Sequence, residues 1–114
     1  MSECLFCRIA AGEIPADKVY EDEQVVAFRD INPKADVHLL VIPRRHIAGL
    51  NELEPAHDAL IAHIMRLLPA LAREQGLESG FRTIINTGRD GGQEVFHLHV
   101  HLLGGRNLPG FSRA

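Results

Sequence analysis

The sequence predicts an α+β domain with a mostly antiparallel five-stranded sheet, a short helix near its start and one longer helix. Five segments have the β-branched or alternating apolar pattern of strands, whereas only two have apolar residues at helical spacing. The order of these segments lacks the regular strand–helix alternation of a parallel sheet. Because 114 residues, 46% of them hydrophobic, suit one core, we expect a single domain over residues 1–114.

The first half of the chain is expected to hold the short helix and three of the strands. Leu5, Phe6 and Ile9 follow helical spacing and Gly12 ends the pattern, so a helix is expected over residues 3–12. A run rich in Val, Tyr and Phe predicts a hairpin, and a continuously apolar run after a loop is typical of a buried strand. The strands are expected at residues 18–21, 24–30 and 38–43, and the loop at residues 31–36.

The second half is expected to form the longer helix and two more strands. Apolar residues recur every three or four positions from Pro55 to Gly76, which predicts an amphipathic helix. Pro69 removes one backbone donor from it, so we expect one kinked helix, with a new helix starting at Pro69 as the alternative. His57 and His63 lie in this segment, match no motif and are expected to face solvent. The strands are expected at residues 81–87 and 95–103, with a glycine-rich loop at residues 88–94.

The charge and composition exclude several classes of partner. The net charge is −3 and the isoelectric point is near 6.1, which gives no electrostatic reason to bind nucleic acid or a membrane surface. No apolar stretch reaches membrane-spanning length, and the first residues lack the basic-then-apolar plan of a secretory signal. We therefore expect a cytoplasmic protein with a small-molecule ligand, whose Cys4 and Cys7 are thiols or metal ligands rather than a disulfide.

Three histidines alternate with apolar residues near the end of the chain. His97, His99 and His101 would stand in a row on one face of the last strand, with the leucines and the valine between them on the other face. Imidazole suits nucleophilic, proton-transfer and metal-ligand chemistry near neutral pH. The row by itself leaves open whether it binds a catalytic metal or acts as a nucleophilic site.

The segment from His97 to Leu103 resembles the signature of the histidine triad (HIT) family, His-x-His-x-His followed by two apolar residues. The following Gly104-Gly105-Arg106 is similar to the branch of histidine-triad nucleotide-binding proteins. Matching segments extend over nearly the whole chain: Phe6, residues 13–15, 27–31 and 38–43, Asn86, and residues 91–93. The resemblance implies the HIT fold and a homodimer whose subunits join their sheets. It also implies hydrolysis of the P–N bond of purine nucleoside 5′-phosphoramidates, with release of AMP through a covalent nucleotidyl-histidine.

The resemblance assigns roles to individual residues of this chain. His99 matches the nucleophile, and His101 and His38 match the two histidines that line the phosphate site. Asp30 matches the carboxylate that binds the ribose hydroxyls. The purine walls correspond to Leu5, Phe6, Ile9, Phe28 and Ile31, and further phosphate contacts to Asn86 and to the backbone around Gly92, Gln93 and Glu94.

A second group of residues suits a structural metal. Cys4 and Cys7 are two residues apart, and together with His46 and His97 they would complete the tetrahedral set that zinc prefers. The resemblance supports this set, since some family members bind zinc there. The Cys-x-x-Cys pair could also be a redox pair or two buried small residues. We expect structural zinc, and no cofactor in catalysis itself.

Two departures and two alternatives accompany the resemblance. Glu94 stands where animal members have a serine. The tail over residues 107–114 is short and lacks tryptophan, whereas in some relatives the tail reaches the partner's active site, so substrate choice is left open. His101 favours a hydrolase over the transferase branch, which has glutamine there. The alternatives are a nucleotide-binding or zinc-bearing interaction protein with incidental turnover, and a dinucleoside polyphosphate hydrolase.

Overall fold

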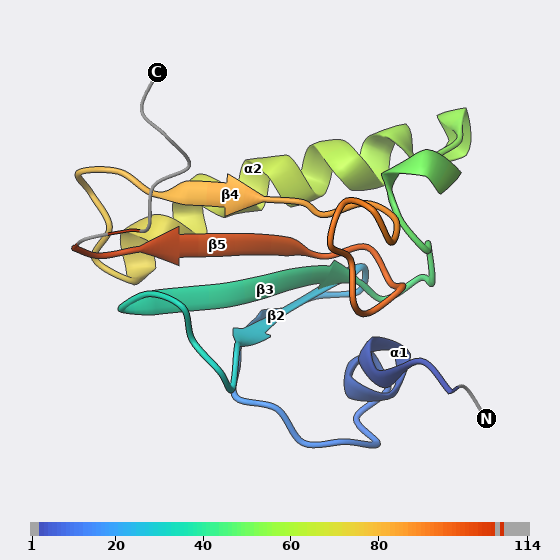
Figure 1. Cartoon of the computed structure of the whole chain (residues 1–114), viewed down its shortest axis with the longest axis horizontal. Helices are drawn as coiled ribbons and strands as arrows, with labels where there is room; N and C mark the ends of the chain where they lie inside the picture. The colour runs from blue at the N-terminus through green and yellow to red at the C-terminus, as the bar shows by residue number, and fades with distance from the viewer. Residues whose placement is uncertain (1–2, 107, 109–114) are drawn as a thin grey trace.

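A computed structural model of the chain describes residues 3–106 and 108, and the predicted tail at residues 107–114 lies almost wholly outside this part. Its elements follow the expected order (Figure 1). They are α1 (Leu5–Ala10), β1 (Lys18–Glu21), β2 (Val25–Arg29), β3 (Val37–Pro43), the 3₁₀ turns η1 (Leu50–Glu52) and η2 (Pro55–His57), α2 (Asp58–Glu74), β4 (Arg82–Ile84) and β5 (Val100–Gly104). The α+β class is confirmed.

The strands form one antiparallel sheet in the order β1-β2-β3-β5-β4. The β1–β2 hairpin turns at Asp22, whose Oδ1 accepts hydrogen bonds from the backbone N–H groups of Gln24 and Val25. An aspartate side chain that binds the backbone in this way replaces the missing turn bonds. Central β3 is continuously buried after Val37, as its apolar run predicted.

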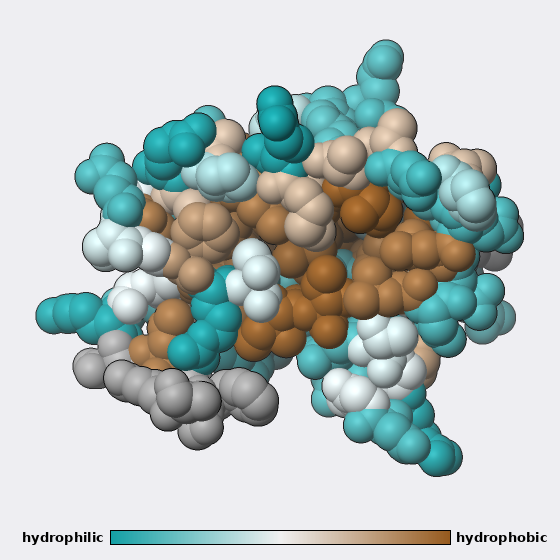
Figure 2. Space-filling view, turned by 90° about the horizontal axis from the view of Figure 1, so that it is seen from above, coloured by the Kyte–Doolittle hydropathy of each residue, from teal (hydrophilic) through white to brown (hydrophobic). Residues whose placement is uncertain are grey.

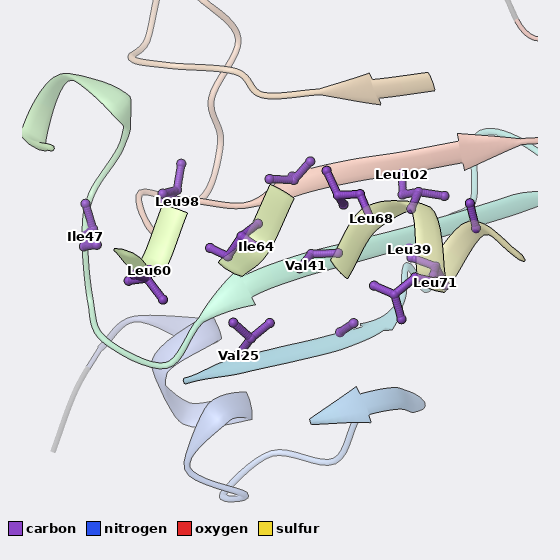
Figure 3. Packing of buried hydrophobic residues seen from close by; sticks show 13 residues of the cluster. Val25, Leu39, Val41, Ile47, Leu60, Ile64, Leu68, Leu71, Leu98 and Leu102 are labelled. Carbon is purple, nitrogen blue, oxygen red and sulfur yellow. The ribbon is translucent and has the colours of Figure 1, made fainter. Parts of the chain in front are cut away.

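Helices cover opposite faces of this sheet. Alternate residues of β2, β3 and β5, among them Val25, Leu39 and Leu102, pack against Ile64 and Leu68 of α2 (Figure 3). The residues between them on β2 and β3 face the other way and pack against Phe6 and Ile9 of α1. The period of two along each strand therefore separates a large core under α2 from a smaller cluster under α1.

Helix α2 is one continuous helix that contains Pro69, so the alternative of a second helix starting there is wrong. Pro69 and Met65 are both exposed, which lets water satisfy the Met65 carbonyl that loses its helical donor. Within the described part of the chain, no helix has the length and apolarity needed to cross a bilayer.

The last two strands are shorter than predicted. β5 begins at Val100 rather than at residue 95, because its partner β3 ends at Pro43, which has no N–H for a further ladder bond. The backbone N–H of Leu98 instead donates to the Ile47 carbonyl over 2.7 Å. Since residues 95–99 leave the sheet, β4 has no partner beyond Ile84. His97 and His99 therefore precede the strand that carries His101.

Neither of the two unassigned histidines is exposed, so the expectation that both face solvent is wrong. His57 is buried, and its Nδ1 accepts the backbone N–H of Glu54, the residue that precedes η2. His63 is half-buried, and its Nε2 lies 2.7 Å from Oδ2 of Asp22. Both contacts depend on chain segments that the helical pattern does not reveal.

Candidate functional site

A cavity of about 640 Å³ opens on the α1 side of the sheet. His38, His99 and His101 line it together with nine of the ten residues predicted to bind a nucleotide: Leu5, Phe6, Ile9, Phe28, Asp30, Ile31, Asn86, Gly92 and Glu94. Ile31 lies at the mouth with 89% of its surface exposed. The structure thus brings together residues from α1, three strands and two loops that are up to 96 positions apart, from Leu5 to His101.

The tenth residue, Gln93, does not line the cavity. Its side chain is buried, donates to the carbonyls of Ala48 and Val95, and accepts the backbone N–H of Gly88. Its hydrogen bonds therefore stabilise the 88–95 loop, and this structural role could not be predicted from the sequence. The packing is tight here, because a Cβ atom on Gly91 would collide with the Thr87 carbonyl oxygen.

The geometry of His99 defines which of its ring nitrogens carries the proton. Its Nδ1 lies 2.7 Å from the carbonyl oxygen of His97, and a carbonyl can only accept, so Nδ1–H is the donor. The neutral ring therefore carries its lone pair on Nε2. The ring is 7% exposed and stands edge-on to Phe6 with 5.1 Å between centroids. A buried imidazole with a fixed tautomer is a prepared nucleophile or metal ligand.

His38 and His101 carry their protons on the opposite ring nitrogen from His99. The backbone N–H of Lys34 donates to Nδ1 of His38 over 3.0 Å, so the proton of a neutral His38 lies on Nε2. That Nε2 lies 2.9 Å from Nδ1 of His101 and donates to it. The proton of His101 is then on Nε2, the ring nitrogen that His38 does not contact. Lys34 was not predicted from the sequence, because only its backbone takes part.

Burial keeps both of these rings neutral. It lowers the pKa of His38, and the nearby Asp30 carboxylate opposes this only in part. Burial, followed by the proximity of His99 and His38, lowers the pKa of His101 to about 4. Neutral His101 therefore presents an N–H on Nε2 beside the Nε2 of His99, and the centroids of the two rings are 5.0 Å apart.

The four predicted metal ligands also come together, with one donor atom from each within 4.8 Å of the others. The Sγ of Cys4 lies 3.3 Å from Nδ1 of His97, and the Sγ of Cys7 lies 3.3 Å from Nδ1 of His46 and 3.5 Å from Nδ1 of His97. A tetrahedral zinc ion with bonds of about 2.3 Å to sulfur and 2.0–2.1 Å to nitrogen separates such ligands by about 3.5 Å. The cluster fits zinc.

His97 is prepared for a metal by its other nitrogen. Its Nε2–H donates to the carbonyl of Pro43 over 2.7 Å, which leaves the lone pair on Nδ1, and the ring is fully buried. Burial lowers the pKa of His97, so the ring stays neutral. Because His97 points to the cysteines, the three triad histidines do not form a metal-binding group in the described part of the chain. The row of three therefore serves two different sites.

Comparison with known proteins identifies the family of the chain. The sequence model of the HIT domain matches residues 11–108. Over 104 residues the chain is 53% identical to protein HitA of Neisseria gonorrhoeae, covering 91% of this chain and 97% of that protein. It is 45% identical to the purine nucleoside phosphoramidase of Escherichia coli K12 (93% and 90% covered) and 45% identical to the 14 kDa zinc-binding protein of Zea mays (94% and 85% covered).

Solved structures show the same fold. A histidine triad protein from Clostridium difficile superposes with a TM-score of 0.93 at 46% identity, with 98% of each chain covered. A HIT family hydrolase from Legionella pneumophila superposes with a TM-score of 0.91 at 50% identity, with 94% of this chain and 96% of that one covered. The sequence model, the relatives and the fold agree, and the chain belongs to the HIT domain family.

Proposed function

We propose that this protein is a nucleotide hydrolase that cleaves the P–N bond of purine nucleoside 5′-phosphoramidates and releases AMP from the adenosine compounds. The observation that carries the proposal is the pairing of opposite nitrogens in one cavity: a lone pair on Nε2 of His99 beside an N–H on Nε2 of His101. Relatives named as a HIT family hydrolase and a purine nucleoside phosphoramidase support the reaction class.

The reaction would proceed in two displacements. Nε2 of His99 attacks the α-phosphorus, the P–Nε2 bond forms and the P–N bond to the amine breaks. The departing nitrogen takes up a proton that solvent supplies through Nε2 of His101, so the ring remains neutral and the amine leaves. Water then attacks the nucleotidyl-histidine, the P–Nε2 bond breaks, and that water releases one proton to solvent as AMP leaves. His38, bonded to Nδ1 of His101, keeps that ring in the tautomer that the first step needs.

The rest of the cavity suits the nucleotide. Phe6, Ile9 and Phe28 form a buried apolar wall that a purine ring can contact. Asp30 offers a charged acceptor for the ribose hydroxyls. Asn86 and Gly92 also line the cavity, and we propose that their N–H groups donate to the phosphate; Gly92 has a φ of +88°, which favours glycine.

An assay with adenosine 5′-phosphoramidate tests the function. The wild type is expected to release AMP, and His99→Ala to lose this activity, while His63→Ala, which alters a histidine on α2 outside the cavity, retains it. Brief mixing with radiolabelled substrate followed by quenching would trap the nucleotidyl-protein in the wild type only. If His99→Ala turned over at the wild-type rate, the mechanism would be wrong. Tight AMP binding without turnover would favour an interaction protein, and faster cleavage of a dinucleoside polyphosphate would favour that substrate.

We also propose that Cys4, Cys7, His46 and His97 hold one structural zinc ion. The support is the spacing of their donor atoms and the similarity to a relative named as zinc-binding. When bound, the metal would cross-link the N-terminal helix to two distant segments. Elemental analysis of untagged protein is expected to find one zinc per chain, and Cys7→Ser to reduce it strongly. Far less than one metal per wild-type chain would contradict the site.

We further propose that the protein is a homodimer joined at the β4 edge. Hydrophobic side chains gather along the middle of the surface seen from the side of α2 and β4 (Figure 2), and Met65, Phe81 and Ile84 are among the exposed hydrophobic residues. β4 is an edge strand of the sheet, and an edge strand can pair with the edge strand of a second copy. Light scattering is expected to give twice the chain mass, and Phe81→Glu to give a monomer. A monomeric wild type at micromolar concentration would exclude the dimer.

A further inference from the structure

We propose that the metal cluster acts as a positioning device for His99, so that metal binding and nucleotide binding strengthen each other. The inference rests on the proposed zinc and nucleotide sites, and it adds a link between them. One residue, His97, belongs to both arrangements: its ring lies in the metal cluster, and its carbonyl oxygen holds Nδ1–H of His99.

The first link runs through the backbone of His97. Four contacts hold this residue through three of its atoms: Nδ1 faces both cysteines, Nε2–H donates to the Pro43 carbonyl, and the main-chain oxygen accepts from His99. His97 is 0% exposed and His99 is 7% exposed, so water cannot readily replace the partner of either ring. A metal on Nδ1 would therefore restrain the atom that orients the nucleophile.

The second link runs through helix α1. Cys4 and Cys7 lie on either side of Phe6, whose ring contacts His97 at 6.0 Å and His99 at 5.1 Å between centroids and also lines the cavity. α1 has six residues, too few for a helix to be stable by itself. It is held by a small apolar cluster and by the contacts of the two cysteines. A metal bound by these ligands would fix α1 against residues 95–99 and so fix the position of Phe6 in the cavity.

The two links make the sites thermodynamically coupled. A nucleotide that orders Phe6 and His99 also orders the ligands on either side of them, so the metal then binds to a better-arranged site. By linkage, the factor by which AMP changes the zinc affinity equals the factor by which zinc changes the AMP affinity. A metal that only stabilises an already folded chain would give a factor of one, so a factor well above one distinguishes coupling from that case.

The first experiment measures this equality on the full chain. Zinc affinity would be determined by competition with a chromophoric chelator, with and without saturating AMP, and AMP affinity by calorimetry on zinc-loaded and metal-free protein. We expect AMP to tighten zinc binding roughly fivefold or more, and zinc to tighten AMP binding by the same factor. Two ligands that bind with less than a twofold mutual effect would overturn the coupling and leave both sites intact. Failure of zinc or of AMP to bind at all would overturn it together with the corresponding proposed site.

The second experiment uses a ligand that lies outside the cavity. His46 is exposed and does not line the cavity, so His46→Ala removes a metal ligand with little direct effect on a nucleotide. We expect it to weaken AMP binding and to lower kcat, and His46→Cys, which keeps a four-ligand zinc set, to restore both. Arg45→Ala, at the exposed neighbouring position, is the matched control and should behave as wild type. A zinc-free His46→Ala protein with unchanged AMP affinity would contradict the inference.

Discussion

His38 and His101 share a hydrogen bond of 2.9 Å in which Nε2 of His38 donates to Nδ1 of His101. The direction of this bond follows from the Lys34 backbone N–H, which occupies Nδ1 of His38. It leaves the proton of His101 on Nε2. A strand residue 63 positions away thus determines which nitrogen of His101 can donate.

Replacement of His38 tests this control of the tautomer. His38→Phe removes the donor, so His101 can carry its proton on Nδ1, and we expect kcat for phosphoramidate hydrolysis to fall about 10²–10⁴-fold, the range typical of a lost proton-transfer group. His38→Gln keeps an N–H near the same point and should lose less. Steady-state kinetics would measure both. An equal fall in kcat in the two variants would show that the N–H donated by residue 38 does not control the activity of His101.

Asp30 predicts a preference for ribose. Its side chain lines the cavity, and a hydrogen bond from a ribose hydroxyl to a carboxylate contributes about 1.5–3 kcal/mol. We therefore expect kcat/KM for adenosine 5′-phosphoramidate to exceed that for the 2′-deoxy compound at least about tenfold, and Asp30→Asn to narrow the ratio. Competition between the two substrates measures the ratio directly. If the ratio were unchanged in Asp30→Asn, Asp30 would not bind the ribose hydroxyls.

The buried histidines predict that acid destabilises the metal-free protein. The pKa of His101 falls from 6.5 in the unfolded chain to about 4 in the fold, and those of His38 and His97 are also lowered. Between these values the unfolded state binds more protons, so the free energy of unfolding decreases as pH falls from about 6.5 to about 4. Urea unfolding across this range would show the loss. His101→Asn should reduce the slope of the free energy of unfolding against pH. An identical slope would show that other groups cause the pH dependence.

The core under α2 can be tested separately from the cavity. Ile64 is 1% exposed and packs against the sheet face opposite the cavity, so Ile64→Ala should lower the free energy of unfolding by about 2–5 kcal/mol. Exposed Arg66 on the same helix is the control, and Arg66→Ala should change it by less than about 0.5 kcal/mol. Well below the unfolding temperature, AMP release by Ile64→Ala should match wild type. A large loss of kcat there would mean that the two faces are not independent.

Much of the architecture could be predicted because it follows from local periodicity. The period of two in β2 and β3 and the helical stripe of α2 depend on neighbouring residues, and both determine which side chains enter the core. Strand ends were predicted less well. Pro43 stops the β3–β5 ladder, and this shortens a strand more than 50 positions later, which no local pattern can indicate.

By itself, the sequence determined the fold class, the order of its elements and the alternation that sends His97, His99 and His101 to one side and Leu98, Val100 and Leu102 to the other. Only the tertiary structure decided what each imidazole does. The Pro43 carbonyl directs His97 to the cysteines, the His97 carbonyl frees Nε2 of His99, and the Lys34 amide acts on His101 through His38. A histidine's role depends on which nitrogen is protonated, and that depends on donors and acceptors that mostly lie far away in the sequence.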